Sequence, residues 1–415
     1  MKVLYFHQHF STPQGSTGTR SYEMARRLIS RGHEVTMVCG SYGGGKTGLE
    51  GAFRKGYRNG VVDEIDVIEF NLGYSNKDGF LKRVFTFLKF ALASIYVALS
   101  HKYDLVFATS TPLTAGIPGI FAKIFRRKPF VFEVRDLWPE LPREMGVITN
   151  PVILKLMSWL EWCSYHSANA CIGLSPGIVG GIKSRNISNE CIEMIPNGCD
   201  LRIFDHDDAE CGELVQGWRP EGVEVDDLMA VFTGTHGIAN GLDSILDGAM
   251  ELKKRGRTNI KLVFIGDGKL KPELKARAQA ENLDNCLFLD PVPKVELSGL
   301  LAEADVGIMA LANIPAFYYG TSPNKFFDYI ASGLPVLNNY PGWLAGLIDQ
   351  HKCGLAVPPD DPEKFADSLE LFADERDSLV LMGANGKALA REQFDRDILA
   401  EKFVNFLESV GQFQK

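Results

Sequence analysis

Patterns that identify several other protein classes are missing from this 415-residue chain. Its eight cysteines form no CxxC pair and no regular framework, which indicates reduced thiols of a cytoplasmic protein and argues against a disulfide scaffold or a zinc site. Lys and Arg total 44 against 52 Asp and Glu. The resulting net charge of −8 argues against a surface that coats nucleic acid, because phosphate binding needs clustered cations. We therefore expect small molecules or a local patch of membrane as partners.

Targeting and membrane-spanning patterns are also scarce. Met1–Phe10 has no cationic stretch followed by an apolar run, so we expect a first strand there and not a signal peptide. Phe80–Ser100 is a long helical pattern, but its uninterrupted apolar part is shorter than the roughly 20 residues that span a bilayer. Two interpretations stay open: a core helix that covers the first sheet, and an interfacial helix with Lys82 and Lys89 over anionic headgroups.

Strand-like and helix-like stretches alternate along both halves of the chain. In the first half, strands are predicted at Lys2–Phe6, Glu34–Cys39, Leu105–Thr109, Phe130–Glu133 and Ala170–Leu174. In the second half, they are predicted at Ala230–Thr233, Lys261–Ile265, Leu287–Leu289, Val306–Met309 and Pro335–Asn338. Helical patterns between the strands are typical of parallel, doubly wound sheets. The predicted fold class is α/β, with two Rossmann-like domains that face each other across a cleft.

An acidic segment broken by Gly and Pro separates the two halves. We predict an N-terminal, acceptor-side domain over residues 1–204, a linker over 205–228 and a C-terminal, nucleotide-binding domain over 229–390. The last segment, 391–415, is expected to be a helix that crosses back to the first domain.

Three motifs suggest other chemistries but lack the context that those chemistries need. Gly40–Thr47 matches the phosphate-loop pattern GxxxxGK[ST], but four glycines between residues 48 and 60 follow where a helix should begin. Asp205–Asp207 forms a DxD in the polar linker and not at a strand end. His7 and His9 have no third metal ligand at a sensible spacing. We therefore expect a loop at Gly40–Thr47, a solvated acidic stretch at Asp205–Asp207, and no metal site at His7 and His9.

The segment Ser322–Pro335 carries the strongest nucleotide-binding pattern. Its opening Ser-Pro pair predicts a helix start. The amides of Asn324 and Lys325, with the Lys325 ammonium, then form an anion site. Asp328 follows one turn later on the same face, where its carboxylate can accept two ribose hydroxyls. The alternative is a capped helix followed by a buried strand.

In their order and spacing, these motifs resemble family 4 of the GT-B glycosyltransferases, the retaining, metal-independent group, over nearly the full chain. The matching segments are Gly32–Val35, Ile195–Phe204, Phe264–Gly268, Ala304–Val306 and Ser322–Pro335. Phe132–Glu140 and Ser322–Lys325 resemble the subgroup that builds bacterial surface polysaccharides, including N-acetyl-L-fucosamine transferases.

The resemblance implies roles for single residues, with two departures from the family pattern. Asp328 replaces the second, ribose-binding glutamate of Glu-x7-Glu, and Gly320 stands where the first, sugar-side glutamate would be. The loop that begins at Gly234 offers no cation besides His236, so Lys325 and Arg20 are the expected substitutes at the diphosphate. The residues expected to bind the donor are Gly15, Gly18, Arg20, Gly234, Gly266, Pro291, Val292, Asn324, Lys325 and Asp328.

The catalytic expectations are weaker because Arg135 and Asp136 occupy the stretch where the family has a histidine. They form either an internal salt bridge or a substrate contact. Lys325, Asp136 and Arg135 are the expected catalytic residues, and Glu140 is the expected acceptor contact. The resemblance implies retention by front-face attack, in which cations and amides stabilise the leaving diphosphate without a metal.

The function implied is transfer from a UDP-sugar, with UDP-N-acetyl-L-fucosamine as one candidate, to a polyprenyl-diphosphate-linked glycan. Such an enzyme would act in O-antigen or capsule synthesis, peripherally on the inner face of the cytoplasmic membrane. A nucleotide-sugar 2-epimerase, a phosphate-loop ATPase and a non-catalytic nucleotide-sugar-binding subunit stay open as alternatives. The choice between UDP and GDP also stays open.

Overall fold

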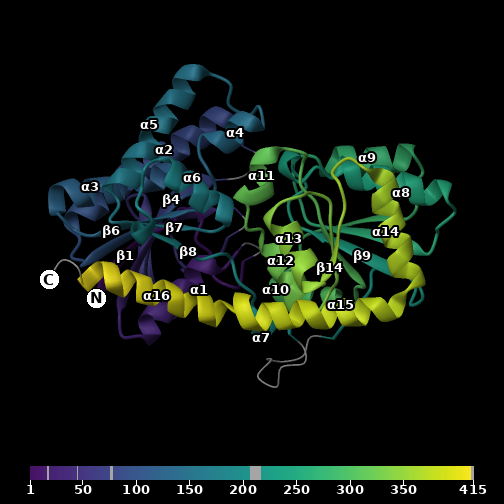
Figure 1. The fold of residues 1–415 in the computed structure, drawn as a ribbon. Coiled ribbons are helices and arrows are strands. Elements are labelled where there is room, and N and C mark those ends of the chain that lie inside the picture. The colour runs from purple at the N-terminus through teal and green to yellow at the C-terminus, as the bar shows by residue number, and fades with distance from the viewer. Residues whose placement is uncertain (16–17, 44, 75–77, 206–215, 413–415) are drawn as a thin grey trace. The chain divides into compact units, whose positions relative to one another are not determined.

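The computed structural model describes residues 1–15, 18–43, 45–74, 78–205 and 216–412 (Figure 1). The chain folds into two compact units. Unit 1 comprises Met1–Pro196, Gly320–Ser322 and Asp397–Lys415, and unit 2 comprises Asn197–Tyr319 and Pro323–Arg396. His206 and Asp207 of the DxD motif lie outside the described residues, as does much of the predicted linker.

Unit 1 contains an eight-stranded sheet in the order β3-β4-β2-β1-β5-β6-β7-β8. Its strands are β1 Lys2–Phe6, β2 Glu34–Tyr42, β3 Tyr57–Val62, β4 Ile65–Tyr74, β5 Leu105–Thr109, β6 Phe130–Val134, β7 Ala170–Gly173 and β8 Ile192–Met194. All neighbouring pairs are parallel except β3 with β4, which form a hairpin. The strand order reverses between β1 and β5, as in doubly wound sheets.

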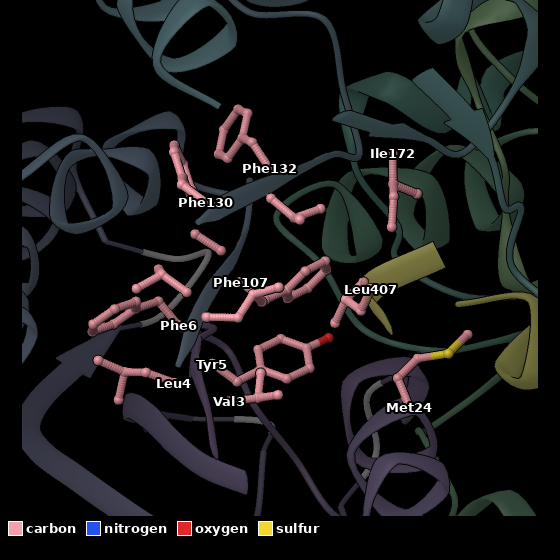
Figure 2. Packing of buried hydrophobic residues seen from close by; sticks show 14 of the residues in the cluster. Val3, Leu4, Tyr5, Phe6, Met24, Phe107, Phe130, Phe132, Ile172 and Leu407 are labelled. Atoms are coloured by element: carbon pink, nitrogen blue, oxygen red, sulfur yellow. The ribbon is translucent and has the colours of Figure 1, made fainter. Parts of the chain in front are cut away.

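The core of unit 1 lies where the central strands are buried on both faces. Every residue of β5 and β6 is buried, which explains their continuous apolar sequences. The Tyr5 and Phe107 rings meet edge to face with centroids 4.5 Å apart (Figure 2). The ring centroid of Phe403, in the C-terminal helix, lies 5.0 Å from that of Phe107, so this helix packs on the first sheet.

Helices flank the strands of both units. Those of unit 1 are α1 Arg20–Ser30, α2 Phe80–Ser100, α3 Ile117–Arg126, α4 Glu140–Glu144, α5 Pro151–Ser167 and α6 Pro176–Ser184, with short 3-10 turns at Leu113–Gly116 and Asn189–Cys191. The last helix, α16 Arg396–Gln412, begins in unit 2 and continues in unit 1.

Unit 2 contains a six-stranded parallel sheet in the order β11-β10-β9-β12-β13-β14. Its strands are β9 Leu228–Thr233, β10 Ile260–Ile265, β11 Cys286–Leu289, β12 Val306–Met309, β13 Val336–Asn338 and β14 Gly354–Ala356. Its helices are α7 Leu201–Phe204, α8 Asp243–Lys254, α9 Lys271–Ala280, α10 Lys294–Glu303, α11 Pro315–Gly320, α12 Asn324–Ser332, α13 Trp343–His351, α14 Pro362–Asp374 and α15 Arg376–Leu389, with a 3-10 turn at Ile238–Asn240 and a π-helical turn at Ala390–Phe394. Both units are thus Rossmann-like, as the sequence predicts.

The two units separate at Pro196, before the predicted boundary at residue 204. The physical reason lies in Asp200, whose carboxylate pairs with Lys294 and Arg396 of unit 2. Phe204 is also fully buried. The segment that starts at Asn197 therefore packs with unit 2.

Candidate functional site

The second sheet reverses its strand order between β9 and β12, and ligands of doubly wound sheets bind outside the carboxyl ends of the strands at such a point. Helix α12 is fixed there by Tyr329, whose Oη accepts a hydrogen bond from the amide of Thr233 at 2.9 Å. A Cβ atom on Gly307 would lie 2.4 Å from the Tyr329 ring. A glycine at this position of β12 therefore gives the ring its space and lets α12 lie close to the sheet.

Lys325 brings its ammonium to the loop after β9. Its Nζ donates to Asn240 Oδ1 at 3.0 Å and lies 4.0 Å from the centre of the Phe232 ring. A Cβ atom on Gly234 would lie 3.3 Å from Lys325 Cε. Burial lowers the pKa of Lys325 to about 7, and no described carboxylate pairs with it. A bound phosphate would supply the missing charge.

The N-terminus of α12 adds backbone donors at the same place. The helix begins at Asn324, and Pro323, not Ser322, occupies the cap position in an extended conformation. The predicted capping role of Ser322 is therefore wrong by one position. The first amides of a helix have no intrahelical acceptor, and the helix dipole favours an anion beside them.

Two glycines let the loops after β9 and β10 meet backbone to backbone. Gly266 has a φ of 150°, and a Cβ atom there would lie 1.8 Å from the carbonyl oxygen of Gly234. A Cβ atom on Gly268 would lie 2.3 Å from the carbonyl oxygen of His236. Gly266 thus has a packing reason for its identity, beyond the donor contact that the sequence suggests.

His236 does not supply the cation that the loop otherwise lacks. Its ring is fully buried among the rings of Phe232, Phe264 and Phe288. Burial, with the nearby charge of Lys271, lowers the pKa of His236 to about 4. The imidazole is therefore neutral at pH 7, and Lys325 is a cation that contacts this loop directly, through Asn240.

Asp328 belongs to a buried charge cluster, the Asp328 cluster, made of Asp200, Lys294, Asp328 and Arg396. Lys294 Nζ lies 3.4 Å from Asp328 Oδ1 and also pairs with Asp200. Arg396 Nη1 lies 2.7 Å from the other Asp200 oxygen. Burial tends to raise both carboxyl pKa values, but Arg396 and Lys294 hold the pKa of Asp200 below its usual range.

The two carboxylates of the Asp328 cluster differ in how far neighbouring cations offset the cost of burying their charge. The pKa of Asp328 is raised, because burial and Asp200 outweigh the attraction of Lys294. Its buried Oδ1 receives no hydrogen bond of good geometry from the described residues, despite the ion pair with Lys294. The Lys294 ammonium, at 3.4 Å, is thus the partner of this buried oxygen.

Sequence reasoning missed Lys294 and Arg396, because nothing in their local sequence indicates a contact with Asp200 or Asp328. The one available signal was Asp200, which lies in the motif Ile195–Phe204. Of the predicted contacts nearby, Asn324 and Val292 are half-buried and Pro291 is exposed.

In unit 1, polar side chains gather where β1, β5 and β6 end. Arg135 Nη1 lies 3.4 Å from His7 Nε2, and the Arg135 amide donates to Ser110 Oγ at 2.9 Å. Asp136 Oδ2 accepts from Thr111 Oγ1 at 3.1 Å. Burial raises the pKa of Asp136, although Arg135 opposes the shift. Among the described residues Arg135 and Asp136 form no ion pair, so the internal salt bridge is not what holds them.

Arg20 occupies a different environment from the predicted one. Its Nε and Nη2 donate to Glu133 Oε2 at 3.0 and 2.8 Å. Nη1 and Nη2 also donate to the carbonyl oxygens of Pro196 and Ile195 at 2.6 and 2.8 Å. With 2% of its surface exposed, the Arg20 side chain links α1 to β6 and to the chain after β8 inside unit 1. Its contact with the diphosphate stays a prediction.

The other residues of unit 1 that the sequence predicts at the site are Gly15, Gly18 and Glu140. The Gly15 amide donates to the carbonyl of Thr12 at 3.0 Å in a turn, and Gly18 is half-buried. Residues 16–17 between them lie outside the described part. Glu140 is exposed at the first position of α4.

The Gly40–Thr47 segment lacks the helix of a phosphate loop. β2 ends at Tyr42, and the next regular element is β3. Thr12 donates its amide to the carbonyl of Lys46 at 2.8 Å, and Thr47 Oγ1 donates to Glu69 at 2.6 Å. Gly40–Tyr42 thus belong to β2 and not to the predicted loop, and no helix begins at the described residues 43 and 45–47. Within the described ranges, no group of three or more His, Cys, Asp or Glu residues could hold a metal ion.

Comparisons with known proteins agree with this geometry. Residues 15–198 match the family model for a glycosyl transferase 4-like domain, and residues 228–375 match the model for glycosyl transferases group 1. The chain is 21% identical over 260 residues to the O-antigen chain mannosyltransferase C of Escherichia coli, covering 62% of this chain and 66% of that protein, just under two thirds. It is 22% identical over 351 residues to the probable glycosyltransferase WbjE of Pseudomonas aeruginosa, covering 83% and 84% of the two chains.

Among solved structures, Anabaena Alr3699/HepE in complex with UDP and glucose superposes with a TM-score of 0.68 at 16% identity, covering 99% of this chain and 100% of that one. At that identity the likeness shows the fold alone. Both halves of the chain match glycosyltransferase domain models, and both units have the sheet that the GT-B fold requires. The chain is therefore a glycosyltransferase of the GT-B class, with a 4-like N-terminal domain and a group 1 C-terminal domain.

Proposed function

We propose that this glycosyltransferase takes its sugar from a UDP-sugar with retention of configuration, and transfers it to a lipid-linked glycan in bacterial surface polysaccharide synthesis. The observation that carries the proposal is on α12. Lys325 has an ammonium without a carboxylate partner among the described residues, and Asp328 has an acceptor oxygen without a hydrogen bond there.

The spacing on α12 suits a nucleoside diphosphate. Lys325 and Asp328 lie three residues apart, which is about 4.5 Å along a helix axis and brings their side chains to neighbouring positions on its surface. A diphosphate beside Lys325 and the first amides of α12 then places the attached ribose near Asp328. An anion and a diol are the two groups that a cation and a carboxylate recognise.

UDP is the proposed carrier. The support is the complex of HepE with UDP and glucose, whose fold is that of this chain. The matched relative from Escherichia coli is named a mannosyltransferase, so GDP-linked donors belong in the same screen. We place the base near Pro291 and Val292, which follow β11 at the same edge of the second sheet.

The proposed reaction needs no enzyme nucleophile. The acceptor oxygen bonds to the anomeric carbon, the bond from that carbon to the diphosphate oxygen breaks, and the acceptor proton goes to the departing phosphate oxygen. Lys325 and the α12 amides stabilise the charge that develops on the diphosphate, as preorganised donors do at low cost in reorganisation. We propose that this stabilisation works without a metal ion.

The acceptor side is proposed at the carboxyl edge of the first sheet. Arg135 and Asp136 stand there beside His7 and Thr111, and Glu140 is close in sequence. The surface-glycan acceptor is supported by the relative named an O-antigen chain mannosyltransferase, and the lipid link is part of the proposal. A lipid-linked acceptor implies work on the cytoplasmic face of the membrane.

The proposal is tested with the purified chain, a panel of UDP-sugars and GDP-mannose, and polyprenyl-diphosphate-linked glycans. Transfer from a UDP-sugar, with retained anomeric configuration by NMR, is the expected result. Isomerised nucleotide sugar without an acceptor supports the 2-epimerase instead. Tight nucleotide-sugar binding without transfer to any acceptor supports the binding subunit.

A further inference from the structure

Helix α2 has one buried face and one exposed apolar face. Phe90 and Ala98 are fully buried against unit 1. The exposed apolar residues are Leu81, Phe85, Leu88, Leu92, Tyr96 and Leu99. Their steps of three and four residues place them on one side of the helix. Leu81–Ser100 meets the length and composition of a membrane-spanning helix, but part of it is buried in the protein. The core-helix interpretation from the sequence thus fits the buried face, and the interfacial interpretation stays a proposal for the exposed one.

Two neighbouring helices of unit 1 also expose large apolar side chains. α3 packs against α2 and against α5, and the three helices lie in the same part of unit 1 (Figure 1). α3 exposes Ile124 and Phe125, and α5 exposes Val152, Leu156, Trp159 and Trp162. We call these six residues and the six of α2 the three-helix apolar face. Trp159 is 64% exposed and Phe125 65%, although soluble proteins rarely leave so many large apolar side chains together in water.

The charged residues within the three helices are mostly basic, although Lys82 pairs with Asp78, just before α2, at 2.7 Å. The basic residues of the three helices are Lys82, Arg83, Lys89, Lys123, Arg126 and Lys155. Their one acidic residue is Glu161, which is buried and paired with Arg185. Lys89 lies over the Phe85 ring at 4.4 Å, so its stem follows the apolar surface. In a chain of net charge −8, such a cationic border is complementary to anionic headgroups.

We infer that the three-helix apolar face docks on a lipid bilayer with anionic headgroups, with the protein lying on the surface and α2 parallel to it. The exposed apolar side chains enter the acyl boundary, the lysines and arginines meet the phosphates, and Trp159 and Trp162 take the interfacial position that tryptophan prefers. A second copy of this chain fits less well, because a two-fold contact would set the two cationic borders against each other. The inference rests on unit 1 alone and is independent of the donor site.

The test is co-sedimentation of the full chain, without nucleotide, with phosphatidylcholine vesicles and with vesicles containing 30% phosphatidylglycerol. One variant combines Leu156→Ser with Trp159→Ser, and a second combines Lys89→Glu with Lys155→Glu. The matched control combines Val380→Ser with Leu381→Ser, which are exposed apolar residues of α15 in unit 2. We expect wild type and control to pellet with the anionic vesicles, and each face variant to bind at least ten-fold less.

All the substituted residues are exposed, and unchanged melting temperatures in buffer show that the variants fold. Wild type that stays in the supernatant with both vesicles overturns the inference, as do face variants that bind like wild type. A wild-type dimer in sedimentation velocity that the apolar variant converts to a monomer, without a change in vesicle binding, assigns the face to a second copy. Loss of UDP binding with intact vesicle binding counts against the proposed donor site only.

Discussion

Lys294 Nζ lies 3.4 Å from Oδ1 of Asp328, and the same ammonium pairs with Asp200. One ammonium therefore serves two carboxylates, and Arg396 adds an ion pair to Asp200. Asp328 is therefore the carboxylate with less compensating positive charge, and its pKa is raised. We interpret this as a site held ready for ligand hydroxyls at some cost in the stability of the empty protein.

Replacement of Asp328 by Asn should therefore stabilise the empty protein near neutral pH. The ordinary pKa of this carboxyl is 3.8, and the folded pKa is higher. The folded state then binds more protons than the unfolded state between the two values, so this group makes stability fall as pH rises through that window. The melting temperature of Asp328→Asn minus that of wild type should grow from pH 4 to pH 7. A difference that shrinks over this range contradicts the assignment.

Asp328→Ala should weaken UDP binding by roughly 10- to 100-fold, because hydrogen bonds to a charged group contribute about 1.5–3 kcal/mol. Calorimetry with UDP and with 2′,3′-dideoxy-UDP separates the ribose contact from other effects. The dideoxy nucleotide should bind wild type and variant equally well. Equal losses for both nucleotides would show that Asp328 acts on the site without touching the ribose.

Lys325→Ala should weaken UDP binding by a similar factor, but it should leave uridine affinity unchanged because uridine has no diphosphate. In wild type, the free Lys325 has a pKa of about 7, and a bound diphosphate raises it. The complex then holds more protons than the free protein above pH 7, so affinity for a UDP-sugar should fall as pH rises from 7 to 9.

Lys325→Arg is the matched control for this pH dependence. A guanidinium stays charged across the range, so the affinity of this variant for a UDP-sugar should be flat from pH 6 to pH 9. A wild-type profile that is flat as well would show that Lys325 is not the titrating group.

The main strands were predictable because a buried parallel strand appears in the sequence as a short apolar run. Lys2–Phe6 and Leu105–Thr109 have the bounds that the sequence predicts. The hairpin of β3 and β4 was missed, since its turn at Asp63 and Glu64 carries no glycine although both residues have positive φ. The glycine-rich stretch before it also resembles an uninterrupted loop.

Only the site residues that lie close together in the sequence were predictable. Lys325 and Asp328 stand on one short helix, so their spacing is visible in the sequence. Lys294 approaches Asp200 across 94 residues, and Arg396 across 196 (396 − 200), so their roles depend on tertiary packing. The Arg20 contact with Glu133 spans 113 residues and was missed for the same reason.

Arg20 should prove to be a stability residue. Arg20→Met leaves Glu133 buried without its partner, which typically costs about 3–5 kcal/mol. Differential scanning calorimetry should show a clearly lower melting temperature for unit 1 in Arg20→Met. The double variant Arg20→Met, Glu133→Leu should recover part of the lost melting temperature. If Arg20→Met had normal stability but no longer bound UDP, the result would support a contact between Arg20 and the diphosphate.

Lys46 should be dispensable for nucleotide binding, since no helix follows it before β3. Lys46→Ala should change the free energy of unfolding by no more than about 0.5 kcal/mol, as surface substitutions usually do, and UDP affinity should be unchanged. ATP turnover by the purified chain that disappears in Lys46→Ala would instead support the phosphate-loop ATPase.

The central claim is that Lys325 and Asp328 of α12 hold a nucleoside diphosphate without a metal. The most direct measurement is the melting temperature of wild type and of Asp328→Ala with increasing UDP in EDTA. At 100 times Kd, UDP should stabilise wild type by about 2.7 kcal/mol, and the same concentration should shift the variant far less. No shift of wild type, or an equal shift of both proteins, would contradict the account.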